Sequence, residues 1–166
     1  SYNFFFRRIE IADGNENLKN AQFICDPWFE DMDVCGDNIQ YTITTDGLLK
    51  ITGTGDMYDH MHPDSDEVSD FSDVTPFVAY SYIIEKVVIE NSVTSIMDNA
   101  FYNYTNLESV EISNAFFIGN SVFYNCTKLK KVTISGSVKS IGIATFGCCS
   151  GLTEVNLPDT ITSIGK

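Results

Sequence analysis

The chain has 166 residues, of which 43% are hydrophobic and 13% aromatic, so its composition excludes general disorder. Twenty-three acids against ten bases give a net charge of −13, and residues 1–83 hold sixteen of the acids but only four of the bases. Nucleic-acid binding needs a basic surface that replaces phosphate counterions, so no nucleic-acid partner is expected. No run of about 18 apolar residues occurs, so we expect no membrane span in this chain.

Residues 1–83 are expected to form an acidic N-terminal cap region. Residues 8–11 alternate apolar and polar side chains like a short strand, and residues 13–15 follow as a turn. Residues 17–24 suit one or two turns of helix before Cys25-Asp26-Pro27 interrupts them. Residues 1–34 show the weakest sequence pattern for secondary structure.

A β-hairpin is predicted over residues 39–51, within the cap. Ile39, Tyr41 and Ile43 alternate with polar neighbours, and Asp46-Gly47 follows them. An Asp-Gly pair between two alternating runs is the strongest short-range signal for a hairpin turn. We therefore expect two antiparallel strands that cover the core of whatever follows.

An acidic, polar loop is expected over residues 56–76. Its carboxylates are potential calcium ligands, but the segment has no D-x-D-x-D-G loop closed by a glutamate at position twelve, which favours a solvated charged loop. Both histidines of the chain, His60 and His62, lie here, and the chain has neither a G-x-S-x-G motif nor a C-x-x-C pair. We therefore expect no enzyme, no metal site and no cofactor.

A motif of 22 or 23 residues occurs four times from residue 84 onward. Each copy begins with an aliphatic triplet: Ile84-Val87-Ile89, Leu107-Val110-Ile112, Leu129-Val132-Ile134 and Leu152-Val155-Leu157. A second apolar pair follows in each copy, and the first three continue to Phe101, Phe123 and Phe146. This period and its L-x-x-V-x-I core predict a leucine-rich repeat solenoid of short parallel strands stacked rung on rung. Residues 84–166 are then four repeats, the last one truncated, and the phenylalanines should stack as one buried column.

The amino-acid motif of the repeats resembles that of a known family. BspA-like leucine-rich repeats contain the motif S-V-T-S-I-G-x-x-A-F-x-x-C-x-x-L. Three stretches of this chain are similar to it: Ser92-Val93-Thr94-Ser95-Ile96, Ala100-Phe101 and Asn125-Cys126-Thr127-Lys128-Leu129. The stretch from Cys35 to Tyr58 resembles the segment that often precedes the first repeat in that family. Three departures stand out: Tyr104 in place of cysteine, Ala115-Phe116-Phe117 in place of Val-Thr-Ser, and Thr145 in place of alanine.

The resemblance implies an extracellular or cell-surface protein associated with adhesion to host or matrix proteins. We therefore expect a non-enzymatic protein-interaction module whose partner is a protein ligand. The alternative is a structural or assembly element that spaces or packs neighbouring domains. Because Leu152–Lys166 ends before the expected phenylalanine, we expect further repeats in a longer parent protein, or self-association through the uncapped C-terminal repeat.

The five cysteines leave several interpretations open. Cys126 and Cys149 share one repeat position, which favours small buried side chains over a disulfide or a metal site. Cys148 takes the position of Asn103 and Asn125 and is expected to turn away from Cys149. Extracellular chains use disulfides in poorly cored segments, so a bridge between Cys25 and Cys35 is also open.

Two asparagines, Asn103 and Asn125, occur in N-x-T triplets that match the glycan acceptor rule. They share a repeat position, which favours a stacked asparagine ladder bonded to the turn.

The outward-facing strand positions are the remaining candidates for ligand binding. Two residues of each repeat qualify, and by register they form two rows: Lys86, Ser109, Lys131 and Glu154 in one, Val88, Glu111, Thr133 and Asn156 in the other. They are mixed, small and polar and contain no aromatic stripe. A solvated face with its ligand elsewhere is the alternative.

Overall fold

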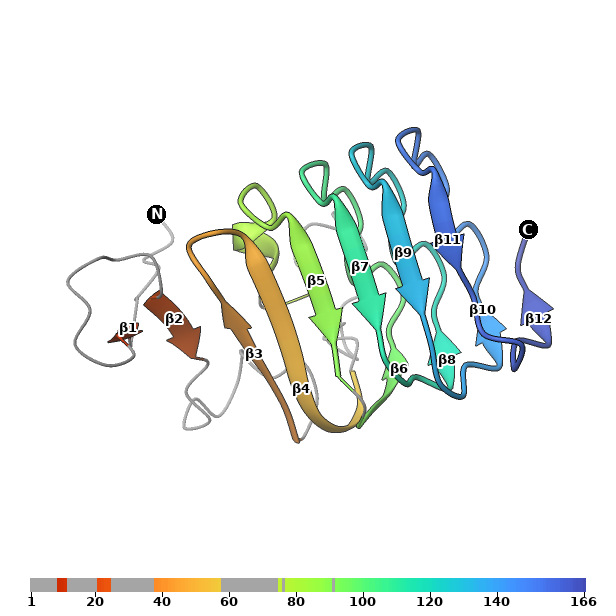
Figure 1. Cartoon of the computed structure of the whole chain (residues 1–166), viewed down its shortest axis with the longest axis horizontal. Helices are drawn as coiled ribbons and strands as arrows, with labels where there is room; N and C mark the ends of the chain where they lie inside the picture. Colours follow the sequence, from red (N-terminus) through yellow and green to blue (C-terminus); the bar gives the residue numbers. More distant parts are fainter. Residues whose placement is uncertain (1–8, 12–20, 25–37, 58–74, 76, 91) are drawn as a thin grey trace, which may run out of the picture.

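Two columns of short parallel strands run along the molecule and enclose its apolar core (Figure 1). The structure is a computed structural model that describes residues 9–11, 21–24, 38–57, 75, 77–90 and 92–166. In the repeats, the strands of the first column (sheet A) are β5 (Lys86–Ile89), β7 (Ser109–Ile112), β9 (Lys131–Ile134) and β11 (Glu154–Asn156). Those of the second column (sheet B) are β6 (Val93–Ile96), β8 (Phe117–Ile118), β10 (Ser140–Ile141) and β12 (Ser163–Ile164).

Each repeat strand pairs in parallel with the equivalent strand of the next repeat. Lys86 lies beside Ser109, Ser109 beside Lys131, and Lys131 beside Glu154, so neighbours are one repeat apart in sequence. Sheet B follows the same rule. The predicted solenoid of leucine-rich repeats is therefore confirmed.

Four strands precede the repeats and continue sheet A in antiparallel order. They are β1 (Ile9–Ile11), β2 (Ala21–Ile24), β3 (Asn38–Ile43) and β4 (Leu48–Asp56). Strands β3 and β4 form the predicted hairpin, which is closed by a hydrogen bond of 2.9 Å from the Thr44 amide to the Leu48 carbonyl. The expectation of helix is wrong for residues 21–24, because strand pairing on both sides satisfies their backbone groups in place of a helical turn.

Strand β4 belongs to both columns. Leu48–Ile51 pairs with β5 in sheet A, whereas Gly55 and Asp56 pair with β6 in sheet B. Gly53 and Gly55 lie at the change of direction with φ of 116° and 98°, values that residues with a Cβ rarely adopt. The strand therefore runs to Asp56, where the acidic loop was expected to begin.

Of the expected loop over 56–76, residues 58–74 and 76 lie outside the described residues. Its two ends are anchored. The Thr94 hydroxyl donates to the Asp56 carboxylate at 2.6 Å, and Met57 is buried. At the other end Thr75 is buried, and Phe77 precedes a short 3-10 helix, η3 (Val78–Tyr80).

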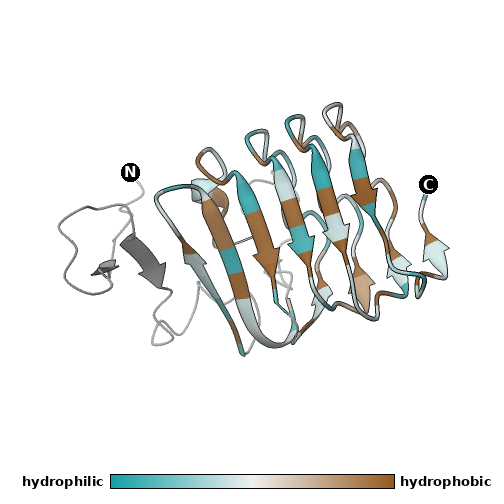
Figure 2. Cartoon of the chain, in the orientation of Figure 1, coloured by the Kyte–Doolittle hydropathy of each residue, from teal (hydrophilic) through white to brown (hydrophobic). Residues whose placement is uncertain are grey.

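The aliphatic repeat positions form the core between the two columns. In the first three repeats every predicted inward-facing aliphatic residue of both strands is at most 3% exposed. In Figure 2 the corresponding hydrophobic band crosses strands β4, β5, β7, β9 and β11 at one level. Burial of this continuous band is what holds successive rungs together, since no single rung can bury its apolar face alone.

The predicted phenylalanine column is present and is longer than predicted. The rings of Phe101 and Phe123 stack with centroids 5.3 Å apart, and those of Phe123 and Phe146 with centroids 5.7 Å apart. Phe77 stacks on Phe101 at 5.5 Å, and Tyr41 of β3 meets Phe77 edge-on at 5.4 Å. The hairpin thus closes the column at its first rung.

Two of the three departures from the repeat phrase have structural explanations. Tyr104 is buried where later repeats place cysteine, packs edge-on against Phe101 at 5.5 Å, and has its hydroxyl 3.4 Å from the Thr75 hydroxyl. The buried Thr145 donates its hydroxyl to the carbonyls of Gly119 at 2.9 Å and Gly142 at 2.8 Å. Both polar groups are therefore satisfied, as buried groups must be.

The predicted asparagine ladder is present on the turns. Asn103, Asn125 and Cys148 have φ of 63°, 59° and 57°, and asparagine tolerates this left-handed region better than most residues. The amide nitrogen of Asn125 donates to the side-chain oxygen of Asn103 at 2.8 Å. The ladder bond therefore joins side chain to side chain, whereas we expected bonds to turn backbone.

The fourth rung is covered on one side only. Val155, Leu157 and Ile164 are 42%, 40% and 58% exposed, although their equivalents in earlier rungs are buried. The difference arises because β11 pairs only with β9 and β12 only with β10 among the described strands.

Candidate functional site

The exposed face of sheet A brings the eight predicted residues together in two rows. In one row Lys86, Ser109, Lys131 and Glu154 are register partners, and in the other Val88, Glu111, Thr133 and Asn156 are. All eight side chains are half-buried or exposed. The strands place these rows on one continuous surface, outside the core.

Ion pairs occupy the charged positions of this face. Lys86 pairs with Glu111 at 2.7 Å, and Lys131 pairs with Glu154 at 2.8 Å. The Asn156 amide also donates to Glu154 at 2.9 Å. Each pair joins neighbouring strands, so the charges are ordered along the sheet but largely cancel one another.

Pairing favours the charged forms of Lys131 and Glu154. The hydrogen bond from Lys131 lowers the pKa of Glu154, and the same bond raises the pKa of Lys131. Beside the face, the hydrogen bond from Lys130 lowers the pKa of Glu108 in the same way. These pairs are exposed, so they contribute little to stability and act mainly as a charge pattern that a partner can read.

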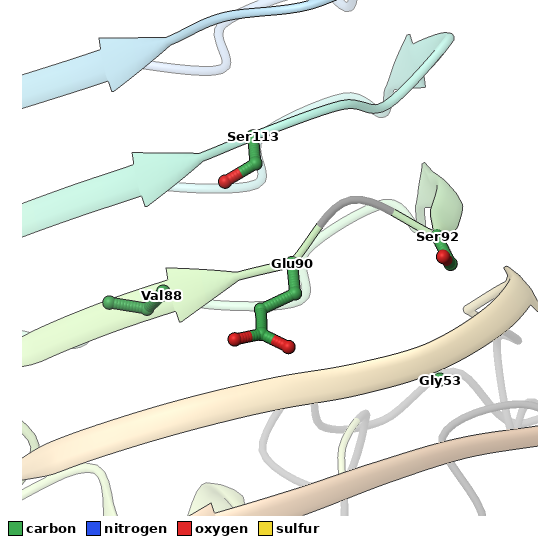
Figure 3. Close-up of a pocket in the computed structure, with 5 residues that line it drawn as sticks. All are labelled: Gly53, Val88, Glu90, Ser92 and Ser113. Carbon is green, nitrogen blue, oxygen red and sulfur yellow. The ribbon is translucent and has the colours of Figure 1, made fainter.

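A shallow pocket of about 310 Å³ lies at one end of this face (Figure 3). Its lining comes from three successive strands and the segments that follow them: Gly53, Val88, Glu90, Ser92 and Ser113. The Glu90 carboxylate is held 2.7 Å from Lys50. The pocket therefore offers one carboxylate and two hydroxyls around a single apolar side chain.

Sequence reasoning found Val88 but missed the rest of the pocket and the Lys50–Glu90 pair. Lys50 sits opposite Val88 because β4 pairs with β5, 38 residues later. Which strand would lie beside it was not encoded in any repeat.

Of the three cysteines in the repeats, Cys126 and Cys149 pack into the core and Cys148 is exposed. Cys126 is buried and Cys149 half-buried, neither is in a disulfide, and their thiols lie 3.3 Å and 3.0 Å from the carbonyls of Phe101 and Phe123. The hydrogen bond with Cys149, together with burial, raises the pKa of the Cys126 thiol. Cys148 is exposed, and its thiol lies 3.3 Å from the Tyr124 hydroxyl. The two neighbouring cysteines thus contact different groups, as expected from the prediction that Cys148 turns away from Cys149. Cys25 and Cys35 lie outside the described residues.

Within the described ranges, no three acidic, histidine or cysteine side chains lie together as metal ligands would. His60 and His62 are outside those ranges. The part of the chain that the structure describes also has no helix with the length and apolarity of a bilayer span.

A sequence model for the BspA type leucine-rich repeat region matches residues 76–166 with six copies, which is more than half of the chain. The chain belongs to the BspA-type leucine-rich repeat family. Repeat arrays of this kind expose extended surfaces for protein interaction.

Two solved leucine-rich repeat proteins share this fold, and a third is reported with them as similar. A leucine-rich repeat protein from Eubacterium ventriosum is 22% identical with a TM-score of 0.55, over 78% of this chain and 38% of that protein. A leucine-rich repeat protein of T. pallidum is 22% identical with a TM-score of 0.51, over 81% of this chain and 64% of that one. A leucine-rich cell surface protein from Faecalibacterium prausnitzii is 23% identical, with a TM-score of 0.40, over 82% of this chain and 45% of that one.

This BspA-type chain thus spans about two fifths to two thirds of the length of the solved proteins it matches. Among curated proteins, none matches it.

Proposed function

We propose that the chain is a non-enzymatic protein-interaction module of a secreted or cell-surface protein, and that it mediates adhesion to host or matrix proteins. The observation that carries the proposal is the two-row face of sheet A. Its side chains are ordered by strand register and carry alternating charges outside the core. Such a surface supplies orientation and partner choice, while the buried band supplies stability.

The test is a charge swap that keeps the ion pair. In the double variant Lys86→Glu with Glu111→Lys, the pair can still form but its two charges are exchanged between the first and second rungs. Binding to immobilised fibronectin, laminin and collagen is measured by surface plasmon resonance. We expect binding of the unaltered chain to at least one of them, and a loss of about tenfold or more in the double variant with an unchanged Tm.

The matched control is Lys128→Glu, which alters an exposed charge on a turn, away from the two rows, where Lys128 donates to the Asn106 side-chain oxygen. Binding should survive in this control. If none of the matrix proteins binds, or if the swapped variant binds as well as the unaltered chain, adhesion through sheet A is wrong.

A second candidate, an assembly element, is favoured by the exposed apolar side chains of the fourth rung. Val155 and Ile164 are 42% and 58% exposed on strands that have a partner on one side only. Sedimentation of the chain should then show concentration-dependent association that Ile164→Asp abolishes. A monomer at every concentration would remove this candidate.

A further inference from the structure

Two phenylalanines of one repeat project from sheet B into solvent. Phe116 is 53% exposed and Phe117 is 43% exposed, although Ala115 and Ile118 on either side of them are buried. Neither ring makes an aromatic contact within the described residues. These rings therefore form a small apolar patch outside the core.

The fold does not require aromatic residues at these positions. The equivalent residues of the preceding rung are Thr94 and Ser95, and Ser140 is the register partner of Phe117 in the following rung. Two backbone hydrogen bonds join the rungs here: the Phe116 amide donates to the Thr94 carbonyl, and the Lys139 amide donates to the Phe116 carbonyl. Neither bond depends on which side chain is present. Two exposed aromatic rings in a row of hydroxyl residues therefore need an explanation other than stability.

Lys139 gives the patch a charge. It follows Phe116 by one rung, is exposed, and has no ion-pair partner in the described part of the chain. By contrast, Lys50, Lys86, Lys130 and Lys131 each pair with a glutamate. The nearest acid on sheet B, Asp56, is three strands away, about 14 Å at the usual strand spacing of about 4.8 Å, and is engaged by Thr94. The patch therefore presents two rings beside a lysine that forms no ion pair with any described residue.

We propose that Phe116, Phe117 and Lys139 bind a protein segment that presents apolar side chains next to carboxylates. The partner needs a carboxylate because it would complement the positive charge of Lys139. Burial of the two rings supplies the affinity, since phenylalanine is enriched in the cores of interfaces. Two of the flanking hydroxyls are engaged within the chain, since Thr94 donates to Asp56 and Thr162 donates to the Lys139 carbonyl, which leaves fewer polar groups for a glycan than for an apolar segment. The surface goes beyond the proposed function, because it lies on sheet B rather than on sheet A.

The experiment titrates the ¹⁵N-labelled chain with three synthetic peptides. One alternates leucine and glutamate, one leucine and lysine, and one serine and glutamate. We expect the leucine–glutamate peptide to shift the amide resonances of Phe116, Phe117 and Lys139, and to bind about tenfold or more tightly than the other two. The Lys86→Glu with Glu111→Lys variant should behave like the unaltered chain, so failure at sheet A and failure at sheet B are distinguishable.

Two variants test the roles of the side chains. Phe116→Thr with Phe117→Ser restores the residues of the preceding rung, should keep its Tm, and should lose at least tenfold in binding. Lys139→Glu should reverse the preference, so that the leucine–lysine peptide binds more tightly. Ile143→Ser, which removes an equally exposed apolar residue (60%) from a turn, is the control and should change nothing.

Three outcomes would overturn the proposal. The first is equal binding of all three peptides or of none. The second is undiminished binding in the Phe116→Thr with Phe117→Ser variant. The third is a concentration-dependent dimer that this same variant disperses, which would assign the patch to a second copy of the chain.

Discussion

Phe123 shows how the repeat uses a buried side chain. It is fully buried and lies between the rings of Phe101 and Phe146. Truncation to alanine removes both stacking contacts and leaves a cavity that close-packed rungs cannot fill. Phe117, six residues earlier, offers the same side chain in an exposed position.

Phe123→Ala should therefore lower the free energy of unfolding by about 3–5 kcal/mol. Phe117→Ser should change it by less than about 0.5 kcal/mol, because surface substitutions rarely exceed that. Urea denaturation of both variants is the measurement. Similar losses in the two variants would mean that the column is not where the stability resides.

Tyr104 makes stability depend on pH in the alkaline range. Burial raises the pKa of its hydroxyl above the ordinary value of 10.0, and the hydrogen bond with Thr75 only partly opposes that shift. Because the folded-state pKa is higher than the unfolded one, the stability that this group contributes is complete below about pH 10 and is lost as the pH rises further.

Tyr104→Phe should cost about 0.5–1.5 kcal/mol at pH 8, through loss of the hydrogen bond. The deficit should shrink as the pH rises above 10, since the variant has no hydroxyl there to ionise. Urea denaturation at pH 8, 10 and 11 measures the difference, with the exposed Tyr82→Phe as control. A deficit that stays constant with pH would contradict the assignment.

At the scale of the elements, the turns between sheet B and the phenylalanine column contain two positions where one methyl group affects stability. Adding a methyl group at the first position should destabilise the chain, and removing one at the second should not. A Cβ on Gly142 would lie 2.5 Å from the backbone of Gly119 in the preceding rung. Two residues later, Ala144 has φ of 52°, a conformation that glycine adopts without cost.

Gly142→Ala should therefore destabilise the chain by about 1–3 kcal/mol, as overpacking does. Ala144→Gly should be neutral or stabilising by up to about 1 kcal/mol, because relief of strain offsets the added freedom of the unfolded chain. Thermal unfolding of both variants measures the pair. If both substitutions lowered the stability, close contact between rungs would not explain why glycine occupies position 142.

The elements also show what sequence could and could not predict. The repeat period fixes which side chains of β5, β7 and β9 face inward, because an error of one residue would bury the charges of the face. Phe77 was missed as the first ring of the column, since it lies outside the repeat phrase. The double role of β4 and the pocket beside it depend on pairing between the hairpin and β5, which no periodicity encodes.

For the candidate site, register predicted the two rows but not their ion pairs. The Lys86–Glu111 contact runs diagonally between rows, so it depends on side-chain reach rather than on position. Phe116 and Phe117 were visible in the sequence as a departure from Val-Thr-Ser. Their exposure became interpretable only with Lys139 placed on the next rung.

At the scale of the whole molecule, the net charge and the repeats lie in different parts of the chain. Residues 84–166 carry seven acids and six bases, so the repeats are nearly neutral while most of the net charge of −13 lies in residues 1–83. In a solenoid each rung contacts only its neighbours, and stability is close to a sum of rung and interface terms. Coupling between rungs, rather than a global core, should therefore hold the molecule together.

That coupling can be measured directly with double-mutant cycles in the phenylalanine column. Phe101→Leu combined with Phe123→Leu should show an interaction free energy of about 0.5–1.5 kcal/mol, because the two rings stack. Phe101→Leu combined with Phe146→Leu should be additive within about 0.5 kcal/mol, because Phe123 lies between them. Additivity in the first cycle, or equal coupling in both, would contradict a structure built from rungs that stack on a shared apolar column.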